Sequence, residues 1–255
     1  AADLAPDDVD VAICNDFPVG AGLGGSSAAG VAVAAAIAAW RSGHGAAVAL
    51  DRVQLAEESR RREVEELGVA GGRQDHYAAA LGGALALTFG ATTEARRIPL
   101  TDEGAAEIER RCVVAYSGES RISGATIDAV IGAYARGEQR VLDELAAMKA
   151  LAREMADALA HADLDRLGAL VGSHWRHQRA LHPSIPTARI DEILARGAAA
   201  GALGGKALGA SGGGCVVLVA GEGREDAVRA AVAPLADLLE FRIDHAGVIV
   251  EEAIA

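Results

Sequence analysis

Aromatic residues are scarce in this chain, and basic residues are outnumbered by acidic ones. Only 3% of the 255 residues are Phe, Trp or Tyr although 51% are hydrophobic, so Ala, Val, Leu and Ile must supply most of the core. The formal net charge of −12 argues against nucleic acid or an anionic membrane as a partner. The sequence also lacks an apolar run typical of a membrane span and the pattern of a signal peptide. We therefore expect a cytoplasmic protein that binds neither nucleic acid nor membrane.

Cysteines are few as well. Cys14, Cys112 and Cys215 are odd in number and widely spaced. This pattern favours neither a disulfide framework nor a zinc site. Because each lies in an apolar, strand-like run, we expect all three to be buried as small hydrophobic residues.

Glycine, in contrast, is concentrated in three loops, and the first covers residues 18–29 (PVGAGLGGSSAA). Its glycines leave room for backbone N–H groups to surround an anion, and the sequence after it predicts a helix over 26–41. The N-terminus of a helix carries unpaired N–H donors and the positive end of the helix dipole, which suits a phosphate. Ser26 and Ser27 could cap this helix or reach a magnesium ion on that phosphate.

The first loop has two other possible interpretations. Gly20, Gly22 and Gly25 formally satisfy the dinucleotide fingerprint G-x-G-x-x-G. That fingerprint requires a second strand that ends in an acidic residue about 20 residues further on. The chain instead predicts two successive helices, 26–41 and 46–67, so the context disagrees. A plain helix cap after a tight turn remains the alternative for the loop taken alone.

The second and third loops strengthen the case for a ligand. Asp75 follows the turn at Gly71 and Gly72 and stands near Arg73. Its carboxylate could accept a proton or orient a hydroxyl, or it could cap the following helix. The third loop, Gly209 to Gly214, precedes an apolar strand; it is either a simple turn or a place where the backbone approaches a ligand closely.

The remaining pattern predicts an α+β chain in two lobes, 1–110 and 111–255, with the charged segment 101–110 as the linker. Strands are expected at 9–13, 84–89, 98–100, 111–116, 215–220 and 240–250, and further helices at 124–136, 138–160, 163–180, 187–200 and 224–238. Five glutamates (Glu57, Glu58, Glu63, Glu65 and Glu66) crowd the second helix, and spacing alone does not choose one for a metal. His174 and His177 lack further ligands nearby, and His76 carries no signal.

In this order the three loops resemble those of the GHMP kinases, the small-molecule kinases that include galactokinase, homoserine kinase and mevalonate kinase. Residues 18–29 are similar to the family's phosphate loop, and 209–215 to the glycine-rich loop of its C-terminal lobe. The runs 72–83, 116–121 and 201–210 are most similar to the heptose 7-phosphate kinase branch. The family's first motif has no counterpart here, and His76 stands where the branch usually has Gln.

The resemblance implies a two-lobe fold, with a truncated N-terminal lobe like ribosomal protein S5 domain 2 and a ferredoxin-like C-terminal lobe. It implies transfer of the γ-phosphate of ATP to a hydroxyl of a heptose phosphate, with Mg²⁺ and with Asp75 as the catalytic residue. Ser26 and Glu63 would hold the metal, and Arg121 either grips the substrate phosphate or is a surface residue. ATP would lie against Gly20, Gly22, Leu23, Gly24, Gly25, Ser26, Ser27, Gly212, Gly213 and Gly214.

Three alternatives stay open at this point. The chain could be a GHMP kinase for another sugar or a small alcohol, or a nucleotide-binding relative without catalysis. A dinucleotide-dependent oxidoreductase is the third. A homodimer is compatible with all of them.

Overall fold

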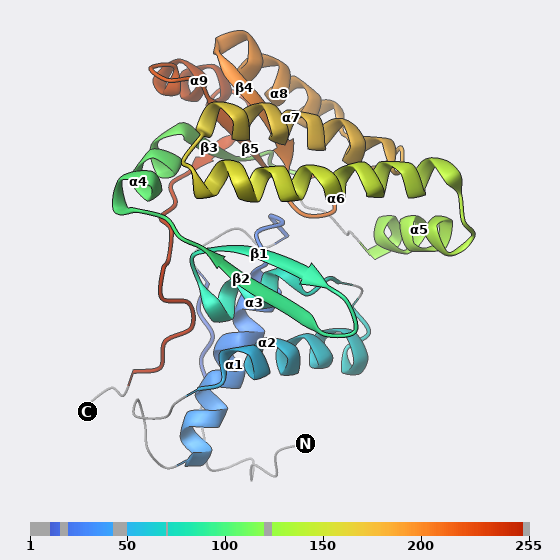
Figure 1. Cartoon of the computed structure of the whole chain (residues 1–255), viewed down its shortest axis with the longest axis vertical. Coiled ribbons are helices and arrows are strands. Elements are labelled where there is room, and N and C mark those ends of the chain that lie inside the picture. Colours follow the sequence, from blue (N-terminus) through green and yellow to red (C-terminus); the bar gives the residue numbers. More distant parts are fainter. Residues whose placement is uncertain (1–10, 16–19, 43–49, 70, 120–123, 252–255) are drawn as a thin grey trace.

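The structure is a computed structural model that describes residues 11–15, 20–42, 50–69, 71–119 and 124–251. Its elements form two groups (Figure 1). The first group holds three helices, a π-helical turn and a hairpin. These are α1 (Gly25–Ser42), α2 (Arg52–Arg61), η2 (Arg62–Glu66), α3 (Gln74–Leu81), β1 (Ala84–Phe89) and β2 (Thr93–Ile98).

The helices of this first group pack closely because most of the side chains buried between them are small. Val31 of α1, Ala56 of α2, and Tyr77 and Ala80 of α3 form one buried cluster, against which the β1 side chains Leu85 and Leu87 pack. The antiparallel hairpin pairs Ala84 with Ile98 and so covers this cluster. These contacts fix α1 and α3 side by side, which determines where the loops that precede them lie.

The second group is built on a four-stranded sheet. It contains α4 (Asp102–Arg111), β3 (Cys112–Tyr116), α5 (Gly124–Ala135), α6 (Gln139–Ala160), α7 (Leu164–Ala180), α8 (Ala188–Ala200), β4 (Ala202–Ala207), β5 (Cys215–Ala220), α9 (Glu225–Val232) and β6 (Asp237–Leu239). The strand order is β4-β5-β3-β6, and all neighbours are antiparallel. This is the ferredoxin-like order, so the predicted α+β class and the topology of the C-terminal lobe are confirmed.

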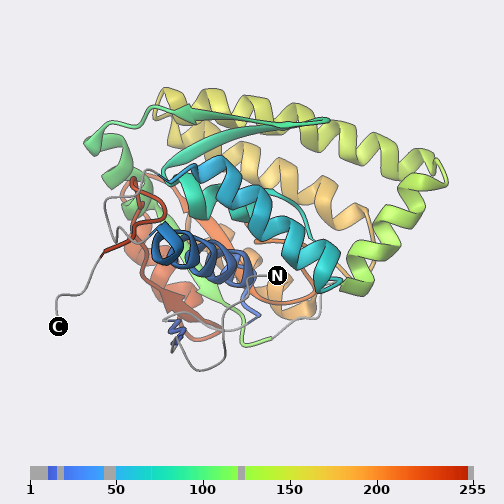
Figure 2. The same ribbon diagram turned by 90° about the horizontal axis from the view of Figure 1, so that it is seen from below.

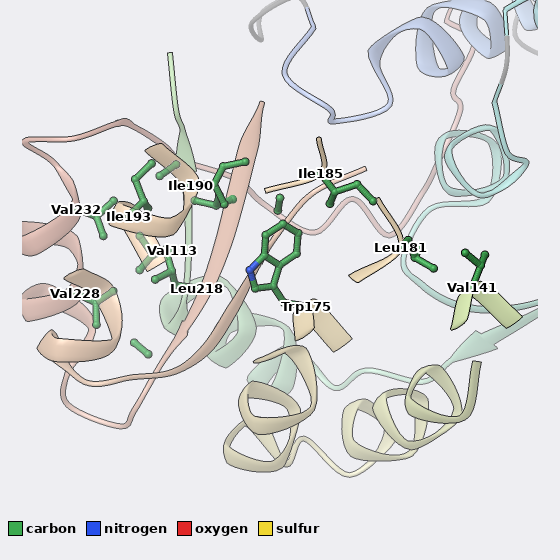
Figure 3. Packing of buried hydrophobic residues seen from close by; sticks show 14 of the residues in the cluster. Val113, Val141, Trp175, Leu181, Ile185, Ile190, Ile193, Leu218, Val228 and Val232 are labelled. Atoms are coloured by element: carbon green, nitrogen blue, oxygen red, sulfur yellow. The ribbon is translucent and has the colours of Figure 1, made fainter. Parts of the chain in front are cut away.

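Helices cover both faces of this sheet. A Cβ on Gly204 would meet Gly168 and Gly172 of α7, whereas a Cβ on the next residue, Gly205, would meet Leu194 of α8. Successive strand residues face opposite sides, so α7 and α8 lie on opposite faces. The main core surrounds Trp175, Ile190, Ile193 and Leu218 (Figure 3).

The chain returns to the first group at its end. After β6 it runs as an irregular segment alongside α3 and the hairpin, as Figures 1 and 2 show. The N–H of Gly83 donates to Asp244 O at 2.6 Å, and the N–H of Val248 donates to Ala80 O at 3.3 Å. Residues 241–251 therefore tie the two groups together.

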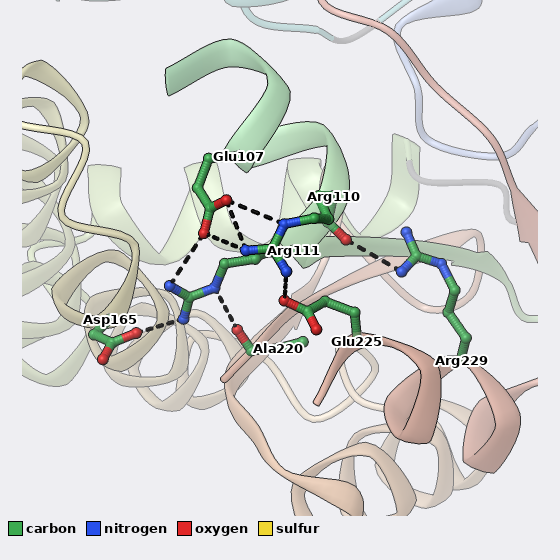
Figure 4. A network of polar contacts seen from close by, with 7 residues as sticks. All are labelled: Glu107, Arg110, Arg111, Asp165, Ala220, Glu225 and Arg229. Atoms are coloured by element: carbon green, nitrogen blue, oxygen red, sulfur yellow. Dashed lines mark hydrogen bonds and ion pairs between the residues drawn. The ribbon is translucent and has the colours of Figure 1, made fainter. Parts of the chain in front are cut away.

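A polar network anchors α4 to the sheet and α7 (Figure 4). Arg111 is only 5% exposed. Its Nε–H donates to Ala220 O at 2.9 Å, and its guanidinium also bonds Asp165. The neighbouring Arg110 bonds Glu107 and Glu225. Buried cations are tolerated only when paired in this way.

Several predicted boundaries are wrong. Residues 102–111 are a helix rather than a linker, because Thr101 caps it and Ile108 packs with Cys112 and Leu164. The strand β2 spans 93–98 instead of 98–100. Helix α9 ends at Val232, two residues before Pro234, which cannot continue a helix. The expected last strand 240–250 is absent; the described chain has only β6 at 237–239 there.

Other corrections concern glycine and cysteine. The strand β4 was not predicted, because its sequence ALGGKA has little strand propensity; its glycines serve the close approach of α7 and α8. Residues 11–13 form no strand, and 9 and 10 lie outside the described residues. Cys112 and Cys215 are buried as expected, but Cys14 is exposed. No helix in the described segments has the length and apolar character needed to cross a bilayer.

Candidate active site

The first loop leads directly into α1. Gly20, Gly22 and Gly24 have φ values of 74°, 78° and 72°, a conformation that costs other residues strain. Helix α1 begins at Gly25, so its unpaired N–H groups belong to the loop's last residues. Ser26 is exposed, whereas Ser27 is buried. The described part of the loop thus has the backbone that binds phosphate in other proteins.

Asp75 lies against this loop. A Cβ built on Gly24 would be 2.9 Å from Asp75 Cβ and 3.0 Å from its Cγ. Helix α3 begins at Gln74 and its N-cap residue is Arg73, so Asp75 lies within the first turn instead of at the cap position. The packing of α1 against α3 therefore brings a carboxylate to the edge of the glycine loop.

The third loop meets the first from the other group of elements. The N–H of Cys215 donates to Ala21 O at 2.7 Å. Gly214 has φ 82°, and a Cβ on it would lie 2.7 Å from the same oxygen. Its N–H donates to Glu119 O at 2.7 Å, and Thr187 at the start of α8 donates to the Glu119 carboxylate at 2.7 Å. All three glycine-rich loops thus converge.

Glu63 is the glutamate that faces the loop. Its side chain is 14% exposed, and its Oε2 accepts a hydrogen bond from Ser27 Oγ at 3.1 Å. It lies in the π-helical turn η2, where the N–H of Leu67 donates to Arg62 O. Such turns are frequent at functional sites. The hydroxyl that contacts Glu63 belongs to Ser27, so the metal role expected of Ser26 stays a prediction.

The other glutamates of this helix point elsewhere. Three of them pair with the neighbouring arginines: Glu58 with Arg62, Glu65 with Arg60, and Glu66 with Arg61. Glu57 accepts from Tyr77 Oη at 2.6 Å, and Arg73 lies 3.8 Å from it. Glu63 differs from the other four glutamates because its side chain faces the first loop. The spacing of the glutamates in the sequence did not show which of them would do so.

His76 was missed by the sequence analysis. It follows Asp75, is 1% exposed, and lies 2.9 Å from Glu63 Oε2 through Nε2. Desolvation lowers its pKa, against the opposing charges of Glu63 and Asp75. The two residues that contact His76, Ser59 and Glu63, are four positions apart. This spacing puts both on the side of the helix that α3 packs against, and it is the one sequence signal for the contact.

The remaining candidates are less informative. Gly212 and Gly213 have φ values of 90° and 133° and continue the third loop, with Gly213 against Glu119. Arg121 and Pro18 lie outside the described residues. His177 bonds Glu144 at 2.5 Å, and burial lowers the pKa of His174 to about 4. The contacts given for these two histidines involve none of the three glycine-rich loops.

The residues at this site fit a magnesium nucleotide. Within the described segments, no group of three or more His, Cys, Asp or Glu side chains could hold a metal ion by itself. Magnesium bound with ATP uses few protein ligands and takes the rest from phosphate oxygens and water. One carboxylate, Glu63, beside serine hydroxyls and a glycine loop is a ligand set of that kind.

Comparison with known proteins gives the family. The family model described as the GHMP kinases N terminal domain matches residues 1–83, and the model of the GHMP kinases C terminal matches residues 155–235. Together the two regions cover more than half of the chain and contain all three loops.

Individual proteins to which the chain is similar are also small-molecule kinases. The D-glycero-alpha-D-manno-heptose 7-phosphate kinase of Campylobacter jejuni is 31% identical over 202 residues, which are 78% of this chain and 58% of that protein. The mevalonate kinase of Pyrococcus furiosus is 27% identical over 96% of this chain and 70% of its own length. The chain thus spans somewhat more than half of the heptose kinase.

A solved structure matches the fold as well. The D-glycero-D-manno-heptose 1-phosphate kinase of Bacteroides thetaiotaomicron superposes with a TM-score of 0.73 at 22% identity, over 95% of this chain and 67% of that one. At this identity the match supports the fold alone. With both family models matched and the three loops in contact, the chain belongs to the GHMP kinase family.

Proposed function

We propose that this protein transfers the γ-phosphate of ATP to a hydroxyl of a heptose phosphate. The observation that carries the proposal is the contact between Gly24 and Asp75, which sets a carboxylate against a loop suited to phosphate. A base placed beside the nucleotide phosphates is what transfer to a hydroxyl requires. The hydrogen bond from Cys215, at the end of the third loop, to Ala21 of the first loop supports the proposal further.

Each residue then has a role. The N–H groups at Gly22 to Ser27 bind the phosphates of ATP, with Gly212 to Gly214 on the other side. Asp75 orients the acceptor hydroxyl and takes its proton while that oxygen bonds to the γ-phosphorus and the bond to ADP breaks. Glu63 and Ser26 would hold Mg²⁺, which when bound neutralises charge on the phosphates.

The acceptor is proposed from the relatives. The Campylobacter jejuni protein, the relative with the highest identity of those described above, is named for a heptose 7-phosphate. Runs 72–83, 116–121 and 201–210 of this chain resemble that branch. Arg121, in the second run, is the proposed contact for the phosphate of the substrate, because a guanidinium matches its oxygens.

A coupled ADP-release screen over sugar phosphates tests the proposal, with heptose 7-phosphate as the expected substrate. Asp75→Ala should abolish transfer and keep ATP binding, measured by calorimetry. Asp143→Ala, on the exposed surface of α6, is the control and should keep both. Binding of ATP without transfer to any acceptor by the unaltered protein would identify a non-catalytic relative. Stronger thermal stabilisation by NAD(H) than by Mg·ATP would refute the proposal.

A further inference from the structure

His76 joins two residues of the preceding helix and turn. Its Nδ1 lies 3.1 Å from Ser59 Oγ, and its Nε2 lies 2.9 Å from Glu63 Oε2. The contact with Glu63 is bent away from the direction of the ring N–H, since Nε2 makes no well-directed hydrogen bond. It is best described as a close electrostatic contact. The ring therefore touches the proposed metal-binding carboxylate directly.

Ser59 is held firmly in place. It is 3% exposed, and a Cβ on Gly30 of α1 would lie 2.4 Å from its Oγ. A side chain at position 30 would thus displace the hydroxyl that contacts His76. Because Ser59, Gly30 and His76 come from α2, α1 and α3, the three helices meet at the Ser59 hydroxyl.

The tautomer of the ring follows from its partners. A neutral imidazole carries a hydrogen on one ring nitrogen and accepts a hydrogen bond with the other. A carboxylate oxygen only accepts, so the arrangement that suits both neighbours puts the hydrogen on Nε2 and lets Nδ1 accept from the Ser59 hydroxyl.

We infer that His76 is a positioning residue that, together with Ser27, holds Oε2 of Glu63 and so leaves Oε1 for the divalent cation of the bound nucleotide. Among the residues that the structure describes, the contacts of Ser27 Oγ and His76 Nε2 with this carboxylate both fall on Oε2. Groups that orient a ligating carboxylate affect metal affinity even though they do not touch the metal. This inference rests on the proposed function, because it assigns the cation site of the same nucleotide complex.

The test measures metal binding without turnover. Mn²⁺ serves as a spin probe with a non-hydrolysable ATP analogue, and its affinity is compared between the unaltered protein and variants. His76→Leu should weaken Mn²⁺ binding by about 10–100-fold. It should leave the metal-free affinity for the analogue unchanged. His76→Gln, which keeps an N–H donor, should retain most of the affinity, and Ser59→Ala should lose part of it.

A double-mutant cycle separates positioning from packing. In a Glu63→Gln background, His76→Leu should have no further effect on Mn²⁺ affinity, because the group through which it acts is already gone. Tyr77→Phe is the matched control, since Tyr77 is also buried in α3 but bonds Glu57. It should bind Mn²⁺ as the unaltered protein does.

The outcomes differ for the two proposals. If the unaltered protein binds no Mn²⁺ with the analogue, the proposed function and the inference both fail. If it binds normally and His76→Leu does too, the inference alone is overturned. An equal loss in the Glu63→Gln background would also overturn it. Should His76→Leu fail to fold, His76→Gln and Ser59→Ala carry the same comparison, and wild-type affinity in Ser59→Ala would count against the inference.

Discussion

Gly24 and Asp75 lie so close together that a side chain on Gly24 would have to displace Asp75. A methyl group on Gly24 would lie 2.9 Å from Asp75 Cβ, and the backbone of Gly24 has φ 72°. Two separate requirements, for conformation and for space, therefore fall on one residue. The loop and the proposed catalytic carboxylate are held in fixed positions relative to each other, because α1 and α3 share the cluster around Val31 and Tyr77.

The first prediction is that Gly24→Ala impairs transfer beyond its effect on stability. The left-handed backbone alone costs about 1–2 kcal/mol, and the clash must also displace Asp75. We expect kcat/KM to fall at least about tenfold, which corresponds to about 1.4 kcal/mol. Steady-state kinetics and chemical denaturation of the same variant measure the two effects.

Gly137→Ala is the matched control for this prediction. Gly137 has φ 69°, and nothing lies within 4 Å of the position its Cβ would take. It should show a similar loss of stability with normal kcat/KM. Equal kinetics for the two variants would mean that the contact with Asp75 is unimportant.

A second prediction concerns the contact between the two groups of elements. Gly214→Ala places a Cβ 2.7 Å from Ala21 O and strains a residue with φ 82°. The hydrogen bond from Cys215 to Ala21 must then lengthen, and the first and third loops separate. ATP affinity should fall, measured by calorimetry. Gly223→Ala, with φ 70° and open space around it, should bind ATP normally.

The sequence predicted local features well and contacts between distant segments poorly. Helix α1 and the glycine loops were found because apolar periodicity and glycine spacing are local signals. Which serine faces Glu63 depends on the rotation of α1 relative to η2, and no local pattern records that. No local pattern singles out His76 either, because its partners, Ser59 and Glu63, belong to other elements.

The missed strand has a similar explanation. The residues of β4 are mostly small, with glycines at 204 and 205, and strand propensity does not favour them. They form a strand because α7 and α8 approach from both faces and leave no space for side chains. The family resemblance, carried by the loops, was the stronger guide to the fold than strand patterns.

The third prediction tests the network at the start of the second group. Arg111→Met removes the donors to Ala220 and Asp165 and leaves a buried carbonyl without its partner. An unsatisfied buried acceptor costs about 1–3 kcal/mol, and the apolar stem of Met recovers part of this. Asp165 adds little to the loss, because its side chain is 71% exposed and is solvated once the arginine is gone. Urea denaturation should show a clear decrease in the midpoint. Arg136→Met, at a side chain that is 65% exposed, should leave the midpoint nearly unchanged.

The last prediction concerns the dependence of stability on pH. Burial, with smaller contributions from Lys206 and His177, lowers the pKa of His174 from 6.5 to about 4. Between these values the unfolded chain binds a proton that the folded chain does not, so acidification across this range favours unfolding. One such group contributes at most about 1.4 kcal/mol per pH unit. His174→Leu should therefore reduce the difference between the urea midpoints at pH 7 and pH 5.

Two features make this pH test selective. The lowered pKa of His76 acts with the same sign, so the variant should keep part of the pH dependence. His161→Gln removes a histidine whose side chain is 72% exposed, and it should leave the midpoint difference unchanged. If His174→Leu also leaves it unchanged, His174 is solvated in the folded protein, and the acid sensitivity between pH 7 and pH 5 comes from other groups such as His76.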